Sequence, residues 1–359
     1  MVNRYLNSSA SDCLRKLKLE DTQLRGTDIG KLLQAMPRQD GQPRNLYFEA
    51  GRNRLEDGHT HFLLAIRNGW TPRSLSLAGT EYRNGWHFKG LFDSIRENTT
   101  IQHLDISKIT LKGLLTLPLS GKISNSISLM IRQNWTLEKL DFSGYATRFE
   151  DDSVIDPNVQ HLLSTLPENK NLKHLDISQR NLVKGGHFLA EAIRKNQTLV
   201  EIRCDDTHIS LEDFTEVVDA VESNFKITFL SDMEKSKQAS LEDFPQSSAS
   251  RKFKKRQSFT MPMLSSVDRK LRESRGKIPQ IKRPSLQLQR VDAQNNDEEM
   301  TLAMWTKQQI RLAGYLARNK KLGEGALEEQ FPGKLFIGNS DEQKKTRNDS
   351  GHEEASCDL

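Results

Sequence analysis

A short apolar motif recurs along the first two thirds of the chain. Its core reads L-x-x-L-x-L, and its central residue returns after 29, 29, 29, 36, 35 and 27 positions. A period of this size predicts about seven stacked repeats over residues 11–232 that share one continuous core. The central positions assigned from this spacing are Leu17, Leu46, Leu75, Leu104, Leu140, Leu175 and Ile202.

Each repeat combines two periodicities. The L-x-L alternation predicts a short strand with one buried face, and the stretch that follows has helical spacing, as in Phe88, Leu91, Phe92 and Ile95. The two long intervals hold insertions, around 115–124 and 148–157, which we expect to form loops. Asparagines close the helical stretches in phase, and we expect a left-handed backbone there. They are Asn68, Asn98, Asn134, Asn169, Asn196 and Asn224.

A period near 29 with one helix per repeat resembles the ribonuclease-inhibitor-like class of leucine-rich repeats. The resemblance covers residues 11–232 and implies an α/β solenoid. Its shape would be a horseshoe, with parallel strands on the concave side and helices on the convex side. Members include ribonuclease inhibitor, the Ran GTPase activator, tropomodulin and the capping-protein regulator CARMIL, and the chain is similar to cytosolic fungal relatives of this group. These proteins act through protein contacts, which implies a protein partner here.

The polar positions of each motif point away from the core, because side chains alternate across a strand. We therefore place a binding surface on the concave side. Its aspartates form a ladder suited to a basic partner segment, although the same aspartates fit repeat consensus in which Asp bonds to nearby backbone or a hydroxyl, and we favour the consensus interpretation. The candidate partner-binding residues are Tyr47, His103, Asp105, Lys139, Asp141, His174, Asp176 and Arg203.

The same histidines and aspartates could in principle bind a metal. Ligands spread over neighbouring strands of a flat ladder do not converge as a closed zinc site requires, so we expect no metal and no cofactor. The chain also has no G-x-S-x-G, H-E-x-x-H or G-x-x-x-x-G-K-[ST] motif. We therefore expect no enzymatic activity, no small-molecule substrate and no specific nucleic acid.

Other residues in the repeats have a structural and a functional interpretation. Trp70, Trp86 and Trp135 could anchor an interface, but packing beside the repeated apolar positions is favoured. The sequons at Asn98, Asn134 and Asn196 fall at one point of the repeat, which indicates repeat chemistry rather than glycosylation.

The first strand follows barely a dozen mostly polar residues, and we expect an exposed apolar edge there, as in a chain that lacks an upstream domain or pairs with another subunit.

Cysteine usage and hydropathy indicate the compartment. Cys13, Cys204 and Cys357 are far apart, which argues against a disulfide framework, and no stretch has the apolar length of a signal peptide or membrane span. We expect a cytoplasmic protein, with a nuclear or membrane-peripheral location as alternatives.

Beyond residue 232 the repeat ends, and the composition of residues 233–359 predicts a largely disordered tail. Residues 1–232 hold 29 Lys+Arg and 30 Asp+Glu, whereas residues 251–290 hold 13 and 2. This basic segment suits nuclear import, an anionic membrane surface or an acidic protein, and an inert solvated linker is equally compatible. Its main cations are Arg251, Lys252, Lys254, Lys255, Arg256, Lys282 and Arg283. A short helix is expected over 297–322, with acids at its start and bases at its end.

Two serines follow basic pairs in the tail. Ser258 in KKRQSF and Ser285 in IKRPSL match the substrate pattern of basophilic kinases, although such patterns also arise by chance. The resulting hypothesis is a non-catalytic scaffold that binds another protein through the concave repeat surface and carries a basic, phosphorylatable tail. One alternative is a GTPase-activating factor similar to the Ran activator, but that relative has an acidic tail and the tail here begins with a basic segment. The other is an actin regulator, for which no binding motif is evident in the tail.

Overall fold

The computed structural model describes residues 2–6, 8, 11, 13–38, 40–112, 117–144, 156–183, 185–231, 233–234, 236–238 and 286–330. Its helices are α1 (Val2–Leu6), α2 (Gly26–Gln34), α3 (His59–Arg67), α4 (Gly85–Glu97), α5 (Leu117–Gln133), α6 (Pro157–Thr165), the 3-10 turn η2 (Leu166–Glu168), α7 (Gly186–Lys195), α8 (Leu211–Ser223) and α11 (Leu286–Gln330). Its strands are β1 (Lys16–Lys18), β2 (Tyr47–Glu49), β3 (Ser74–Ser76), β4 (Glu81–Tyr82), β5 (His103–Asp105), β6 (Thr110–Leu111), β7 (Lys139–Asp141), β8 (His174–Asp176), β9 (Glu201–Arg203) and β10 (Phe229–Leu230).

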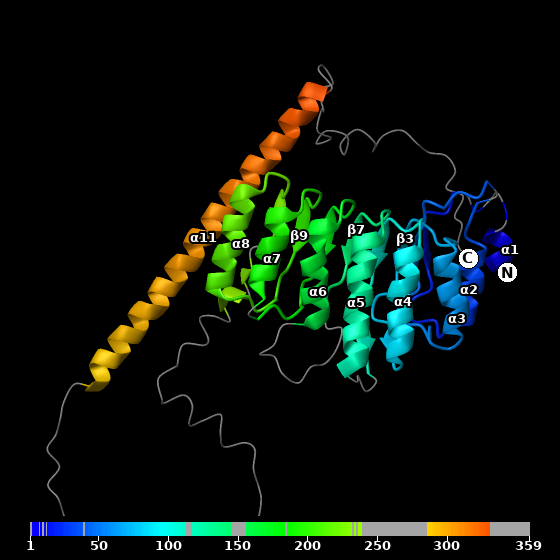
Figure 1. The fold of residues 1–359 in the computed structure, drawn as a ribbon, viewed down its shortest axis with the longest axis horizontal. Coiled ribbons are helices and arrows are strands. Elements are labelled where there is room, and N and C mark those ends of the chain that lie inside the picture. Colours follow the sequence, from blue (N-terminus) through cyan, green and yellow to red (C-terminus); the bar gives the residue numbers. More distant parts are fainter. Residues whose placement is uncertain are drawn as a thin grey trace, which may run out of the picture. The chain divides into compact units, whose positions relative to one another are not determined.

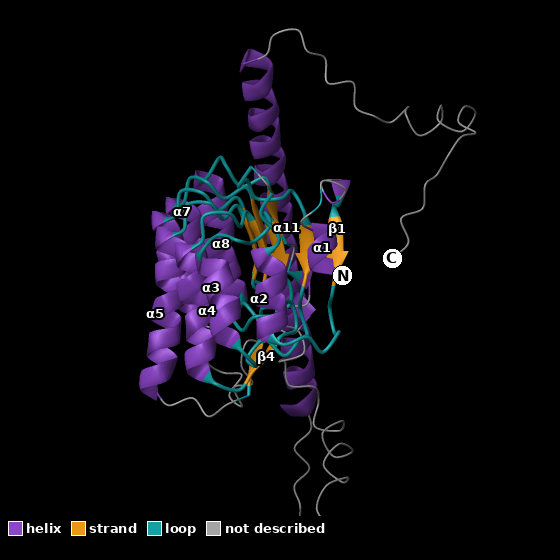
Figure 2. Ribbon diagram, turned by 90° about the vertical axis from the view of Figure 1, so that its right-hand side faces the viewer, coloured by secondary structure: helices purple, strands orange, loops and turns teal. Residues whose placement is uncertain are grey.

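Eight of the strands form one parallel sheet in the order β1-β2-β3-β5-β7-β8-β9-β10. Helices α2 to α8 lie in series along it (Figure 1) and cover one of its faces (Figure 2). Each strand sends its central side chain toward these helices, for example Leu75, Leu104 and Leu175, all at most 2% exposed. The chain is therefore an α/β protein with a fold like that of leucine-rich repeats, in which a parallel sheet and a row of helices enclose one core.

The strand register corrects the alignment of the second repeat. Phe48, not Leu46, pairs with Leu17 and Leu75 at the central position. Leu46 is also buried, but it precedes the strand. Both residues have the right alternation, and the regular spacing of 29 favoured the wrong one. Tyr47 therefore pairs with Lys16 and Ser74 at the first position of its strand. The alignment on Leu46 would have placed Tyr47 at the last position, which Glu49 occupies instead.

Two further elements differ from expectation. An eighth strand, β10, pairs with β9 and places Leu230 opposite Ile202. Its signal is present in the sequence, because Ile227 and Leu230 follow Asn224 at the spacing that Leu199 and Ile202 have after Asn196. The insertion expected as a loop at 115–124 lies largely in α5, which begins at Leu117. Of the second insertion, residues 148–155 lie outside the described residues.

Five of the six predicted asparagines form a buried ladder, whereas Asn68 is exposed. The expected left-handed backbone is wrong, because Asn98 and Asn224, for example, have φ angles of −72° and −102°. Instead Nδ2 of Asn134 donates to the backbone oxygens of Ile95 (2.7 Å) and Asn98 (3.0 Å) in the preceding repeat. Its Oδ1 accepts from the amides two and three residues later. Asn98, Asn169, Asn196 and Asn224 make corresponding contacts.

This ladder explains why asparagine recurs after α4, α5, η2, α7 and α8. A buried backbone carbonyl needs a donor, and a carboxamide satisfies carbonyls of one repeat and amides of the next at once. Asn98, Asn134 and Asn196 are at most 2% exposed, so the sequons indeed mark repeat chemistry.

At the N-terminal end of the sheet, residues 1–12 contribute more than expected. Leu6 of α1 is fully buried, and its backbone oxygen accepts from Nη2 of Arg44 over 2.6 Å. Arg44 Nη1 also donates to the Ser11 oxygen (3.1 Å). The cover is incomplete, because Leu14 and Leu17 are only partly buried. The edge strand thus differs from the inner strands, whose central residues are enclosed on both sides.

At the other end, α11 packs on the last repeat. The Trp305 indole is fully buried and stacks on Phe214 of α8, with ring centroids 4.8 Å apart. Around it, Nη2 of Arg311 contacts Asp219 (2.9 Å) and Glu222 (3.1 Å). Because of these contacts, the compact unit that contains the repeats extends to Asn319. The helix spans 45 residues and includes the expected segment 297–322.

One contact of α11 is the same as in the repeat helices, the bond to the backbone oxygen of the preceding ladder asparagine. Nδ2 of Asn319 donates to the backbone oxygens of Asn224 (2.8 Å) and Ile227 (2.7 Å). Leu312 and Leu316 precede Asn319 by seven and three positions, as Leu189 and Ile193 precede Asn196. Both α11 leucines pack on the core. Helix α11 therefore stands where the helix of a further repeat would stand. Among the described helices, none is both long and apolar enough to cross a membrane.

Candidate functional site

The face of the sheet opposite the helices carries two rows of polar side chains. The first and last residues of each three-residue strand point to this face, because the central residue points into the core. We call Asp105, Asp141 and Asp176 the acidic row, since they are register partners at the last position. His103, Lys139 and His174 are partners at the first position and form the His/Lys row.

The acidic row has a structural role that the consensus interpretation anticipated. Oδ1 of Asp105, Asp141 and Asp176 accepts from the backbone amide of the serine two residues later, over 2.9 to 3.0 Å. Asp105 also accepts through Oδ2 from the Ser76 hydroxyl at 2.7 Å. These bonds close the turn after each strand. The donors in these bonds are uncharged, so the bonds do not cancel the negative charge of the row.

No Lys or Arg within the described ranges forms an ion pair with Asp105, Asp141 or Asp176. Neighbouring strands lie about 4.8 Å apart, so the three carboxylates repel one another. Burial, and secondarily the charges of Asp105 and Asp176, raise the pKa of Asp141 above its ordinary value, although bonds from Ser143 act against this. A cationic group placed on the row would relieve this repulsion.

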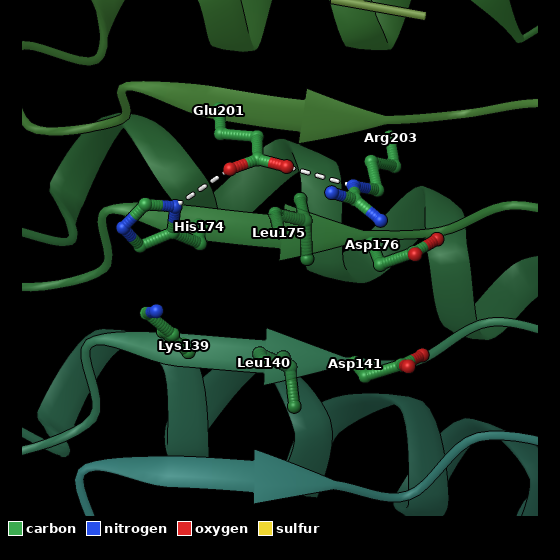
Figure 3. A pocket seen from close by; sticks show the side chains of 8 residues that line it. All are labelled: Lys139, Leu140, Asp141, His174, Leu175, Asp176, Glu201 and Arg203. Atoms are coloured by element: carbon green, nitrogen blue, oxygen red, sulfur yellow. Dashed lines mark hydrogen bonds and ion pairs between the residues drawn. The ribbon is translucent and has the colours of Figure 1, made fainter. Parts of the chain in front are cut away.

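The His/Lys row is partly engaged with its neighbours. Nδ1 of His103 lies 3.0 Å from the Ser74 hydroxyl, and burial, with Lys139 nearby, lowers the pKa of His103. Nδ1 of His174 lies 3.0 Å from Oε2 of Glu201. Oε1 of the same carboxylate accepts from Nε of Arg203 at 2.7 Å (Figure 3). Glu201 thus links the first position of β8 to the last position of β9.

These residues line a shallow hollow of about 210 Å³ over β7, β8 and β9. Its floor is the backbone around Leu140 and Leu175, and its rim carries Lys139, His174, Asp141, Asp176 and Arg203 (Figure 3). Burial opposes ionisation of Glu201, but the bonds from Arg203 and His174 outweigh it and lower its pKa. The hollow therefore presents fixed charges of both signs rather than an apolar cavity for a small molecule.

The structure brings together most of the residues that the sequence singled out. Asp141, Asp176, Lys139, His174 and Arg203 share one hollow, whereas His103 and Asp105 lie one strand farther along. Tyr47 lies on the same face at the first position of β2, three strands from Lys139. Ser258, Ser285 and the tail cations Arg251, Lys252, Lys254, Lys255, Arg256, Lys282 and Arg283 lie outside the described residues.

Sequence reasoning missed Glu201, which pairs with two of the predicted residues. Its signal was its place before the core residue Ile202, equivalent to the place of His174 before Leu175. In the part of the chain that the structure describes, no group of three or more His, Cys, Asp or Glu side chains is arranged to hold a metal ion. Here His103 and His174 point to a hydroxyl and a carboxylate of neighbouring strands.

A buried ion pair behind the acidic row was also missed. Arg180 replaces an apolar core position, that of Ile109, and is 1% exposed. Its Nε donates to the Phe142 oxygen at 2.6 Å, its guanidinium lies 4.0 Å above the Phe142 ring, and Nη1 contacts Asp156 at 3.2 Å. Asp156 also caps α6 by accepting from the Asn158 amide. Arg180 therefore fixes the start of α6 to the strand before it.

Comparisons with known proteins add little to this picture. No protein-family model matches the chain, and no curated protein does. Among solved structures, leiomodin-1 actin-binding site 2 is 11% identical, covers 75% of this chain and 93% of its own, and has a TM-score of 0.31. The tropomodulin C-terminal domain of Caenorhabditis elegans is 9% identical, covers 74% and 96%, and has a TM-score of 0.30. Likeness this low supports no inference about function.

Proposed function

We propose that this protein is a non-catalytic binding module that recognises a protein partner through the open face of its sheet. The observation that carries the proposal is the acidic row, in which Asp105, Asp141 and Asp176 lie side by side and form no ion pair among the described residues. Arg203 lies beside Asp176 at one end of the row, but its guanidinium is bonded to Glu201. We take this face to be the concave side of a leucine-rich-repeat horseshoe. Such a surface offers a partner many polar contacts in fixed register.

The geometry specifies the kind of partner. The acidic row and the His/Lys row are two positions apart along each strand, so they run in parallel about 7 Å from each other. A partner segment that crosses the strands meets negative charge on one side and neutral or positive groups on the other. Charge complementarity of this kind fixes orientation and excludes wrong partners. A segment with basic residues facing the acidic row fits best.

A direct test compares binding of a purified basic peptide by wild type and by Asp105→Asn/Asp141→Asn/Asp176→Asn. Asparagine keeps the oxygen that closes each turn, so the fold should be retained. A matched control removes three acids from the helices, Glu97→Gln/Glu191→Gln/Glu212→Gln, which changes the net charge equally. We expect the row variant alone to lose binding. Equal loss in both triple variants would show an effect of net charge and contradict the proposal.

The natural partner can then be sought by affinity purification with mass spectrometry, using the same two triple variants. Proteins captured by wild type and the control but not by the row variant are candidates. A GTPase or actin in this set would favour the corresponding alternative. We also propose a cytoplasmic location and a role for the basic segment 251–290 as a second contact, regulated by phosphorylation of Ser258 and Ser285.

A further inference from the structure

A second surface lies at the edge of the sheet, where each helix turns back into the next strand. Here a hollow of about 510 Å³ is lined by Trp135, Glu138, Lys170, Lys173 and Lys226, among others. We call it the edge hollow. It belongs to the loops after the asparagine ladder and shares no residue with the acidic row.

Trp135 is a large aromatic residue at a position that points outward in each repeat, because the preceding asparagine is buried in the ladder. The equivalent residues are Thr99, Lys170 and Gln197 in the neighbouring repeats and Phe225, also exposed, after the last ladder asparagine of the repeats. The packing expected for Trp135 is wrong, because its side chain is 66% exposed. A large exposed aromatic beside a hollow is typical of an interface anchor, since its burial by a partner removes much apolar area from water.

The charge of the edge hollow is locally positive. Nζ of Lys173 forms an ion pair with Glu138 at 3.0 Å. Lys170 and Lys226 are exposed and have no carboxylate partner within the described ranges. Three lysines and one glutamate give a local excess of two positive charges, although residues 1–232 as a whole hold 29 basic and 30 acidic residues. The excess is therefore a property of this edge and not of the repeats in general.

We propose that the edge hollow binds an acidic segment of a partner protein, with an apolar side chain of that segment resting on Trp135. The partner's carboxylates would face Lys170 and Lys226, which line the same hollow as Trp135. An anchor in a pocket with complementary charge at its rim is the usual form of such sites. The proposal does not depend on binding at the acidic row.

A protein segment fits the edge hollow better than a nucleic acid. Single-stranded nucleic acids need a continuous basic path and successive stacking platforms, and Trp135 is the one aromatic side chain that lines this hollow. Phosphate backbones also respond to the charge of the whole domain, which for residues 1–232 is one negative charge. A short acidic peptide meets only the local excess.

The edge hollow also continues onto the sheet. Glu138 and Lys173 immediately precede Lys139 and His174, the first residues of β7 and β8. A partner seated on the open face therefore reaches Trp135 without leaving the protein surface. This continuity explains how one partner could use both surfaces, but each surface can be tested alone.

The test uses the full chain and an array of acidic 12-residue peptides, each with one of the twenty amino acids at its centre. We expect binding at low salt to peptides with a central aromatic or leucine, and not to the same peptide with glycine. Trp135→Thr, which installs the residue of the equivalent Thr99, should weaken binding about tenfold. Lys170→Gln/Lys226→Gln should weaken it similarly and reduce its dependence on salt.

The matched controls change residues that do not line the edge hollow. Trp86→Thr replaces another exposed tryptophan, and Lys31→Gln/Lys122→Gln removes two other lysines. These variants should bind as wild type does, and so should the triple variant of the acidic row. The proposal is overturned if no acidic peptide binds wild type, or if Trp135→Thr binds as tightly as wild type while remaining folded. Tighter binding of a dodecathymidine probe would also overturn it, in favour of a nucleic acid. Loss of binding in the row variant alone would assign the peptide to the sheet face.

Discussion

Asn319 of α11 donates to the backbone oxygen of Asn224 over 2.8 Å, in the way that Asn224 donates to the backbone oxygen of Asn196 over 3.0 Å. The two asparagines are 95 residues apart in the sequence. Asn224 belongs to the repeats, and Asn319 belongs to the helix that follows them. Helix α11 is thus the terminal cap of the ladder. It covers the polar groups and the apolar end that the last repeat would otherwise expose.

The first prediction follows from this contact. Asn319→Ala leaves the oxygens of Asn224 and Ile227 without their donor, so it should lower the free energy of unfolding by about 1–3 kcal/mol. The amides of β10 should also exchange faster with solvent. Lys307→Ala, an exposed position on the same helix, is the control for helix propensity. Unchanged exchange at β10 in Asn319→Ala would show that α11 does not cap the array.

A second prediction concerns the core of the repeats. Leu175 is 1% exposed, and Leu175→Ala should cost about 2–5 kcal/mol because it removes buried methyl groups and leaves a cavity. Leu64→Ala, at a position 47% exposed on α3, should change stability by only about 0.5 kcal/mol. Urea unfolding of both variants measures the difference. Equal midpoints for the two variants would remove β8 from the core.

The third prediction is a pH dependence from Asp141. Its pKa is raised in the folded state, so the folded protein binds its proton more tightly, and ionisation of Asp141 destabilises the fold as pH rises. Asp141→Asn should therefore be as stable as wild type or more stable at pH 7. The difference should close as pH falls below about 4, where Asp141 is protonated. Thermal melting at several pH values checks this, and a variant much less stable at pH 7 would contradict it.

A fourth prediction addresses the buried pair. Arg180→Met leaves Asp156 without its partner, and Asp156→Asn leaves a buried guanidinium unpaired while keeping an oxygen for the Asn158 amide. Each should cost about 3–5 kcal/mol. The double variant should be less destabilised than the sum of the two, which a double-mutant cycle measures. Simple additivity would mean that the ion pair itself contributes nothing.

The fifth prediction concerns the basic segment. Residues 251–290 hold 13 basic and 2 acidic residues, a net charge of +11, and each phosphate adds about −1.5 to −2. Phosphorylation of Ser258 and Ser285 should therefore weaken co-sedimentation of the full chain with vesicles containing phosphatidylserine. A Ser258→Ala/Ser285→Ala variant treated with the same kinase is the control. Equal binding before and after phosphorylation would exclude the switch.

Much of the fold could be predicted from the sequence, because repeated local patterns encode it. The alternation around Leu75, Leu104 and Leu175 gave the strands, and the spacing gave the helices between them. The second repeat shows the limit. In RNLYFEAG both Leu46 and Phe48 satisfy the alternation, and only the pairing with Leu17 and Leu75 selects Phe48.

The site was predictable to the extent that it follows strand position. Asp141 and Asp176 share a row because they occupy the same place in consecutive repeats. Glu201 could have been placed on this face from its position before Ile202, but its pairing with His174 of the preceding strand is not visible in the local sequence. Arg180 was missed because its partners Phe142 and Asp156 lie in the preceding repeat. The contact of α11 with α8 is equally non-local. Residues such as Trp305 and Phe214 are about ninety positions apart, and no periodicity connects them.

The position of α11 has a consequence for how the chain tolerates insertions. Residues 239–285 separate the last described residues of the repeats from α11 in the sequence. If a connection is flexible, the entropy of closing it grows only with the logarithm of its length, and doubling its length costs about 0.6 kcal/mol. An insertion within a repeat would instead displace the ladder itself. The stretch before α11 is therefore where a reporter domain or an added binding motif could be inserted with little effect on the folded array.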